Sequence, residues 1–495
     1  MRRSILQRSS VWRKAPRFAS VTLCLGLAGC FAGTERPELG LDLPGRYRDA
    51  PRNADVALPS VVWWQNFRSR ELTSLVEQAL VSNTDIGAAV ARILQADAQA
   101  RITGAALLPV IDADASVSRQ QSPGGTLGGT SVRNTINVSF SASYEIDFWG
   151  KNRSALRSAE QSAVASRFDR ETVALSTVAA VANSYFQVLG AQDRLRAARE
   201  NLDAASRVFN LIEERLKVGT ASALDTAQQE AVVAAQRAAI PPLEQVLADS
   251  RITLATLVGR APSSIAVRGG SMRSITIPPV TPGLPSDLLV RRPDLRSAEA
   301  ALEAANANVE SARAAMLPSV QLAGSGGYAS SALRTLMRPE SALFNLAAGL
   351  TQPIFDGYRL RGQLDLSRGR QEELVQIYRG AVINAFADVE RALNAVRLTA
   401  ERERLQRAAV DSARRAFQIS ETQLREGAVD LVNVLTSQQQ LFQAQDALAV
   451  ARLARLQATV SLFQALGGGW PMPGDRSLMR AAQETNAPAP RAVVR

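Results

Sequence analysis

The sequence contains no histidine, and only 5% of its 495 residues are aromatic. Histidine is the commonest general base near neutral pH and the commonest metal ligand, so its absence argues against most hydrolases and metalloenzymes. We therefore expect no enzyme, and neither a metal centre nor another cofactor. A chain of this length could hold several domains, but its abundance of Ala, Leu, Gln, Arg and Glu is typical of long helices.

Cysteine is also scarce, since the sequence has only Cys24 and Cys30. Around them a basic stretch precedes the apolar run "FASVTLCLGLAGC", which is too short to span a bilayer as a helix and is typical of an export signal. Its end, "LAGC" at 27–30, resembles the bacterial lipoprotein signal. Residues 1–29 are then a lipoprotein signal peptide, and Cys30 is the lipidated first residue of a tether that we place at 30–67. Because Cys24 leaves with the signal and Cys30 carries lipid, no intrachain disulfide can form.

The formal net charge of +11 gives little support to nucleic-acid binding. Six of the eleven charges lie before residue 30, where there is no acid, so the rest of the chain carries +5. No basic cluster with interleaved aromatic residues follows, and such a cluster is the usual footprint of a nucleic-acid site.

Phe31 follows the lipidated cysteine where an Asp would favour retention at the inner membrane, so we expect delivery to the outer membrane.

Four motifs recur along the chain at offsets of 209, 207, 208 and 208 residues. A shift this constant over more than 150 residues marks an internal duplication. We place the first copy at 68–258 and the second at 286–469, with a Pro- and Gly-rich equatorial connector at 259–285 and a C-terminal tail at 470–495. The matched motifs end at or surround Pro109 and Pro318, Gly150 and Gly357, Gly219 and Gly427, and Gly259 and Gly467.

Each copy predicts the same order of elements, with a helix, two strands of alternating polarity, and two long helices joined at a glycine. A helix of about 60 residues would extend about 100 Å. Paired prolines at 241–242 predict a break in the returning helix of the first copy only. The expected helices are 68–106, 151–218 and 222–257, then 286–316, 358–426 and 430–466. The expected strands are 111–121, 134–148, 319–330 and 341–354.

The four strands have one apolar and one polar face, which is compatible with lipid on one side. Inside a bilayer every backbone group must be paired, so such strands must close into a barrel. Four strands cannot close, because the narrowest common barrels have about eight, but three chains would supply twelve. A soluble sheet lying on helices is the alternative reading. The expected outward positions are Ile111, Ala113, Val117, Phe140, Tyr144, Ile146, Val320, Leu322, Phe344, Leu346 and Leu350.

The long helices carry leucines at nearly heptad spacing, which favours coiled-coil pairs that could extend the barrel as a tube. Gly150 would let one wall change from strand to helix. The clearest series is Leu431, Leu435, Leu441, Leu448, Leu456 and Phe463.

Several motifs in this order resemble the TolC-like outer-membrane efflux family, in its lipoprotein (NodT-type) branch. They are "YEIDFWGKNR" at 144–153, "LLVRRPDLRSAEAAL" at 288–302, "VLTSQQQLFQAQDAL" at 434–448 and "LFQALGGGW" at 462–470. The resemblance implies a mainly α, internally duplicated homotrimer. It would have a twelve-stranded outer-membrane β-barrel, a periplasmic helical barrel and a mixed girdle.

The resemblance further implies the exit duct of a tripartite efflux pump, which conducts small molecules passively. Its partners would be a periplasmic membrane-fusion adaptor, an inner-membrane resistance–nodulation–division transporter and outer-membrane lipid. Metal efflux and type I protein secretion are alternatives with the same fold, and a lipid-anchored coiled-coil scaffold without a pore is a third.

The resemblance also assigns roles to the two helix turns. The adaptor would bind there, although the glycines in any case suit a turn that needs a positive φ. The residues concerned are Lys217, Val218, Gly219 and Thr220 in the first turn and Glu426, Gly427 and Ala428 in the second.

The residues after the second turn, where the duct of the family closes, depart from the family pattern; we call this region the gate. Relatives often carry an acidic ring after the second turn, where this chain has Asn433 and Thr436, and Asp430 is the nearest acid. A ring of three carboxylates would bind cations, and a neutral ring would do so less. We therefore expect closure through hydrogen bonds and pairs of the Arg425–Asp430 type. Nearer the girdle, Arg292 and its neighbours predict an ion-paired helix start.

Overall fold

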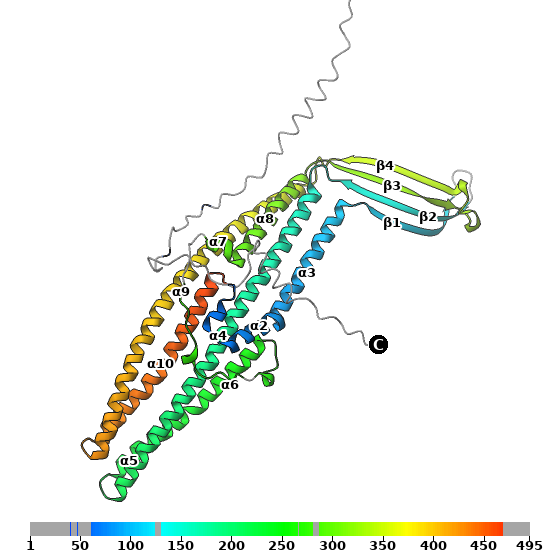
Figure 1. Cartoon of the computed structure of the whole chain (residues 1–495). Helices are drawn as coiled ribbons and strands as arrows, with labels where there is room; N and C mark the ends of the chain where they lie inside the picture. Colours follow the sequence, from blue (N-terminus) through cyan, green and yellow to red (C-terminus); the bar gives the residue numbers. More distant parts are fainter. Residues whose placement is uncertain are drawn as a thin grey trace, which may run out of the picture. The chain divides into compact units, whose positions relative to one another are not determined.

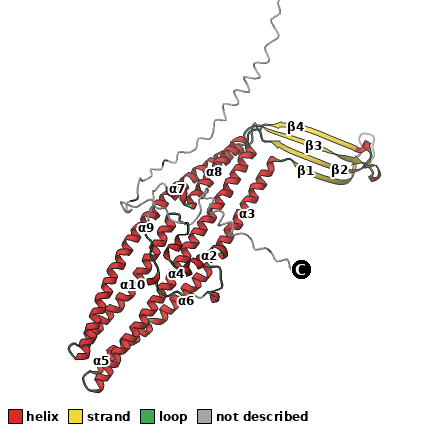
Figure 2. Cartoon of the chain, in the orientation of Figure 1, coloured by secondary structure: helices red, strands yellow, loops and turns green. Residues whose placement is uncertain are grey.

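The computed structural model describes Gly40, Tyr47 and residues 61–123, 130–265, 267–280 and 287–468 (Figures 1 and 2). All of them belong to one compact unit that begins at Gly40. The predicted signal peptide 1–29, Cys30 and the tail from 470 lie outside the described residues.

The longest helices lie within about a residue of the expected ranges. They are α4 (Lys151–Lys217), α9 (Arg359–Glu426) and α10 (Leu431–Ala465). Each of the two helices that precede a strand pair is divided, contrary to expectation. The pieces are α2 (Arg70–Ser82) and α3 (Thr84–Gly104), and α7 (Asp287–Arg291) and α8 (Pro293–Ala314).

Local capping explains both divisions. Asn83 is extended, and its side-chain oxygen accepts hydrogen bonds from the backbone of Asp85 and Ile86, which starts a new helix. In the second copy Arg292 is extended and precedes Pro293, which occupies the first turn of α8. The residue before a proline disfavours the helical region, so a break is expected there.

The predicted break in the first copy is confirmed. The returning helix is split into α5 (Ala223–Ala238) and α6 (Ile240–Leu257), with prolines at the first positions of α6. Its counterpart α10 in the second copy is continuous over 35 residues.

The strands form one antiparallel sheet in the order β1-β2-β3-β4. β3 has the expected bounds, whereas β1 and β2 reach farther toward their shared turn and β4 is shorter. β2 stops two residues early because the carboxylate of Asp147 accepts hydrogen bonds from the backbone of Asn152 and Arg153, which starts α4. The strand bounds, from β1 to β4, are Val110–Pro123, Thr130–Ile146, Ser319–Ser330 and Ala342–Thr351.

The helices that adjoin the strands lie side by side in the same order as the strands of the sheet. α3 precedes β1, α4 follows β2, α8 precedes β3 and α9 follows β4. In space α3 packs on α4, α4 on α8, and α8 on α9, as Figure 1 shows. The sheet therefore continues four helices side by side, and α3 and α9 are the outer helices as β1 and β4 are the outer strands.

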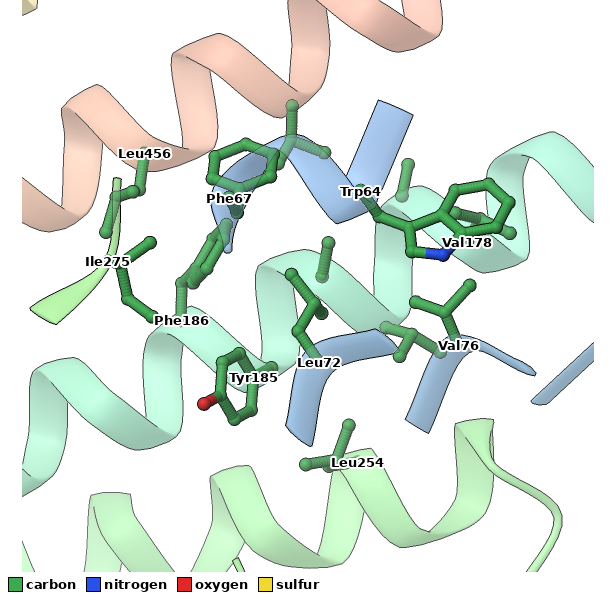
Figure 3. Packing of buried hydrophobic residues seen from close by; sticks show 14 of the residues in the cluster. Trp64, Phe67, Leu72, Val76, Val178, Tyr185, Phe186, Leu254, Ile275 and Leu456 are labelled. Atoms are coloured by element: carbon green, nitrogen blue, oxygen red, sulfur yellow. The ribbon is translucent and has the colours of Figure 1, made fainter. Parts of the chain in front are cut away.

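Away from the sheet, each copy forms a helical hairpin. In the first hairpin α4 packs on α5 and α6, and in the second α9 packs on α10. The short helix η2 (Trp63–Phe67) is buried between them (Figure 3). Trp63 stacks on Phe463 of α10 with ring centroids 5.0 Å apart, and Phe67 contacts Phe186 of α4. An apolar stretch of α4 is suitable in length and composition for a membrane span, but most of it is buried in this core.

Candidate functional site

The register of the sheet separates apolar from polar side chains. Phe140 of β2 lies between Ala113 of β1 and Gly326 of β3, which itself pairs with Phe344 of β4. Since side chains alternate along a strand, residues paired in this way share a face. All eleven expected outward positions lie on one face, so that prediction is confirmed. We call it the apolar face; Phe344 on it is 85% exposed.

The opposite face, called here the polar face, carries short polar and acidic side chains. Asp112 pairs with Ser141, which pairs with Ser325 and in turn with Asn345. An uncovered apolar face opposite a polar one is typical of a sheet between lipid and water. The other polar-face positions include Asp114, Ser116, Asn137, Ser139, Glu145 and Gln321.

Within the described chain, β1 and β4 each pair on one side only. Their outer edges offer backbone N–H and C=O groups that cannot remain unpaired in lipid. One chain is therefore an open segment of a wall.

The junction between sheet and helices carries aromatic side chains from both copies. Phe148 and Trp149 lie edge to face with ring centroids 4.7 Å apart, and Phe355 and Tyr358 do so at 6.0 Å. Phe148, Phe355 and Tyr358 are exposed. Aromatic side chains prefer the boundary between membrane and water, so this level is a candidate for that boundary.

Gly150 acts at the junction as predicted, with a φ of 79° immediately before α4. Glycine adopts this left-handed conformation without the penalty that a Cβ would bring. The indole N–H of Trp149 donates to the carbonyl of Pro318 at 2.7 Å, which ties the two copies together here.

At the far ends of the hairpins, the two turns have the same geometry. Gly219 and Gly427 have φ values of 76° and 77°. The N–H after each glycine donates to a carbonyl five residues earlier, at 2.8 Å in both turns. This is a helix end closed by a left-handed glycine. The structural role expected of both glycines is therefore present.

The first turn exposes the apolar side chains of Val218 and Leu224, and the second exposes that of Val432. Between the hairpins, a guanidinium N–H of Arg215 donates to the carbonyl of Leu424 at 2.7 Å. A small cluster that includes Ile212, Leu424 and Val434 lies behind this contact.

The gate candidates flank the second turn, with Arg425 in the last turn of α9 and Asp430, Asn433 and Thr436 at the start of α10. Arg425 contacts Glu421, one helical turn earlier, at 3.6 Å. No ion pair joins Arg425 to Asp430 among the described residues. Asp430 is the N-cap residue of α10 and its carbonyl accepts from Asn433, while the hydroxyl of Thr436 donates to the carbonyl of Val432. Glu421 and Arg425 share a helix face, which explains their contact within the chain, and the role of Arg425 and Asp430 in closure stays a prediction.

Sequence reasoning missed an acid at the tip. Asp225 lies 208 residues before Asn433, at the matching position of the first copy. Its carboxylate accepts from the backbone N–H and hydroxyl of Ser222, and these hydrogen bonds lower its pKa. The duplication offset could have identified it, because it maps each candidate of one turn onto the other.

The cluster at the start of α8 is ion-paired as expected. Arg292 contacts Asp294 at 2.7 Å and Asp388 of α9 at 3.2 Å, and it also donates to the carbonyl of Ala465. It joins three helices of the second copy. Among the described residues there is no group of three potential metal ligands.

A family model described as outer membrane efflux protein matches residues 75–260 and 284–468. The chain belongs to this family. It is 42% identical over 457 residues to the pyoverdine export outer membrane protein OpmQ of Pseudomonas aeruginosa, which covers 91% of this chain and 96% of that protein. It is 32% identical over 440 residues to the probable efflux pump outer membrane protein TtgC of Pseudomonas putida, over 88% and 90% of the two chains. The solved structure of the outer-membrane channel OprN matches with a TM-score of 0.84 at 26% identity, over 89% and 99%.

These similarities confirm the family resemblance, the fold class of helical body and β domain, and the location in the outer membrane of a Gram-negative bacterium. The protein acts in efflux across that membrane as an exit duct. The family match falls twice, once on each copy of the duplication. A scaffold without a pore does not agree with this membership.

Proposed function

We propose that three copies of the chain close into one duct that conducts small molecules passively and performs no chemistry. The observation that carries this is the sheet, with its apolar face, its polar face and its two unpaired edges. Two copies would give eight strands, whose interior is about filled by side chains, whereas three give twelve and leave a bore. The polar face would line that bore.

The outer helices support the same closure. When β4 of one copy pairs with β1 of the next, α9 and the next copy's α3 become neighbours. α9 exposes Leu366, Ile377 and Ile383, and α3 exposes Val90, Leu94 and Ile102. The helical glycines Gly87, Gly362 and Gly369 have open space around them within the described chain. Glycine inside a helix costs about 1 kcal/mol relative to alanine, so close approach of a second helix is a reason for it.

The partners follow from the same arrangement. A periplasmic adaptor would bind the turns at Lys217–Thr220 and Glu426–Ala428, beside the exposed Val218. An inner-membrane transporter of the resistance–nodulation–division type would supply the energy. Cys30 would carry the lipid that delivers the chain to the outer membrane.

We propose organic molecules of drug or siderophore size as the cargo. The support is that the relative at 42% identity is named for pyoverdine export and the one at 32% identity as an efflux pump protein. In a deletion strain, restored secretion of a fluorescent peptide siderophore by the wild-type gene would favour the first. Restored antibiotic tolerance alone would favour the second, and restored metal tolerance would favour the metal alternative.

The first measurement is the single-channel conductance of the purified protein in a planar bilayer, together with its mass by native mass spectrometry. A trimer with small, rare openings that enlarge when Asp430 and Arg425 are neutralised supports a gated duct. Large, steady conductance contradicts the gate. A monomer without conductance contradicts the proposed function itself.

A further inference from the structure

The connector crosses both hairpins through residues 268–275, called here the strap. On the first hairpin, the carboxylate of Asp193 accepts from the backbone of Met272 at 2.9 Å and from the hydroxyl of Ser271. Arg196 donates to the carbonyl of Gly270 at 2.6 Å. At its start, the N–H groups of Arg268 and Gly269 donate to Glu71. These contacts bind the strap to α4 and α2.

Arg452 donates hydrogen bonds from the second hairpin to the strap, and Ile275 of the strap also lies in one apolar cluster with Leu456 of α10 (Figure 3). Arg452 of α10 donates to the carbonyl oxygens of Met272, Arg273 and Ile275 at 3.0, 3.5 and 3.4 Å. Its side chain is 16% exposed. An arginine can serve several acceptors at once because its planar group carries five N–H donors.

Glu403 of α9 holds Arg452 in that position. Its side chain is 2% exposed, and it contacts Arg452, Arg455 and Arg407 at 2.8 to 2.9 Å. Burial alone would raise the pKa of Glu403, but the hydrogen bond from Arg455 and the charge of Arg452 outweigh it, so the pKa lies below its ordinary value. The carboxylate stays charged and keeps Arg452 directed at the strap.

The first copy provides an internal comparison, because the matching positions, 208 residues earlier, carry different side chains. Leu195 stands for Glu403, Glu244 for Arg452, and Leu247 for Arg455. Only Arg199, the counterpart of Arg407, is retained, and it pairs with Glu244 at 2.9 Å with both side chains at least half exposed. The charged cluster directed at the strap therefore belongs to the second copy alone.

Just beyond the strap, part of the space between the two hairpins is open. A cavity of about 690 Å³ lies there between α4, α9 and α10. Its lining is largely charged and includes Glu200, Arg273, Asp411 and Arg414. Charged side chains around water do not hold helices together as apolar packing does. Between the strap and the tips, the hairpins are also joined by the ion pair of Arg194 of α4 with Asp446 of α10 at 2.6 Å, and Phe442 of α10 belongs to one apolar cluster with α4 side chains.

We infer that the strap, Glu403 and Arg452 form a clamp that holds the second hairpin to the first at mid-length and limits how far the tips separate. This inference rests on the proposed function of a gated duct, and it adds that separation of the hairpin tips opens that duct. Loss of the clamp lets the second hairpin swing outward about its attachment to the core, so the duct opens more often.

The test transfers the first copy's residues into the second with Glu403→Leu, Arg452→Glu and Arg455→Leu. Arg407 can then pair with the new glutamate as Arg199 pairs with Glu244, so no charge is left buried and alone. We expect hydrogen exchange of the strap amides to rise by about tenfold or more, because their local opening becomes easier. We expect the open probability in planar bilayers to rise as well. Arg199→Gln, which removes the exposed pair of the first copy, is the matched control and should change neither.

A conservative variant separates the clamp from general loss of structure. Arg452→Lys keeps the charge beside Glu403 but has one nitrogen for three carbonyls, so strap exchange and open probability should rise together without loss of the trimer. Faster strap exchange with unchanged openings would overturn the inference, as would unchanged exchange. If the wild-type protein formed no pore, the proposed function would fail while strap exchange still reported on the clamp.

Discussion

The two hairpins of this protein descend from one plan, yet their charges are arranged differently where the strap crosses them. In the first hairpin the ion pair Arg199–Glu244 joins α4 to α6 and is exposed. In the second the acid, Glu403, lies on α9, is buried and contacts three arginines. Duplicated halves that fold alike can therefore differ in the charged contacts that hold them to the rest of the chain.

The helices that run back from the tips also differ between the two hairpins. The first is divided between α5 and α6, with prolines that remove backbone donors at the start of α6. The second, α10, is continuous over 35 residues. Substitutions at matched positions of the two hairpins test this comparison.

The largest effect is expected from Glu403→Leu alone. It leaves Arg452 and Arg455 without their carboxylate, and breaking a buried pair from one side is costly. Because Arg455 is 34% exposed, we expect the free energy of unfolding to fall by about 2–4 kcal/mol, less than for a fully buried ion pair. Thermal unfolding followed by helical circular dichroism measures it. Leu195 shows that the position tolerates leucine, so adding Arg452→Glu and Arg455→Leu should restore most of the loss.

A second comparison concerns Gly259 and Gly467, which end the two returning helices with φ values of 74° and 69°. A Cβ at Gly259 would overlap the backbone oxygen of Ser82, whereas at Gly467 it would lie 2.8 Å from that of Arg291. Gly259→Ala should lower the free energy of unfolding by about 3 kcal/mol and Gly467→Ala by somewhat less, because the strain of a positive φ adds to the steric overlap of the new Cβ. Gly219→Ala, where the space is open, should cost about 1 kcal/mol. Equal losses at all three positions would contradict this order.

The gate offers a functional comparison. Asn433→Asp would place three carboxylates near one another in a trimer, where divalent cations can bridge them. We expect a lower open probability that falls further when Mg²⁺ is added, while the wild-type protein responds weakly. Asp430→Ala tests the acid that is present. If it leaves the closed-state conductance unchanged, Asp430 takes no part in closure.

The smallest effect is expected at Asp225, the acid that caps α5. Its pKa is lowered in the folded protein, so its contribution to stability is complete above the unfolded value of about 3.9 and is lost as the pH falls through the folded value. Hydrogen exchange at the first tip, corrected for intrinsic rates, should therefore accelerate below about pH 4. Asp225→Asn should remove that acceleration, and the second tip, with Asn433 at the matched position, should show none.

Much of the fold could be predicted from particular residues. Alternation from Phe140 to Ile146 predicted a two-faced strand, and the register confirms that its apolar side chains share a face with those of the other strands. Gly150, Gly219 and Gly427 predicted the turns where they occur. These succeeded because strand alternation and left-handed glycines are local properties of the backbone.

The candidate site was predicted less well. Asp430, as the nearest acid to the gate, suggested a pair with Arg425, and within the chain Arg425 contacts Glu421 on its own helix face. Glu403 was not recognised, since it lies in a run of alternating acidic and basic residues at 401–404 that gives no sign of burial. Asp225 went unnoticed although the duplication offset pointed to it.

The sequence by itself determined the duplication, the order of helices and strands, the alternating faces and the family, because periodicity, turn residues and motif order are written along the chain. Only the tertiary structure decided which helices lie at the edges, that the strap crosses both hairpins, and that Glu403 is buried among three arginines. Those features depend on which elements pack side by side after more than a hundred residues of intervening chain. No local preference records such a neighbour, so its charge and burial appear only when the chain is folded.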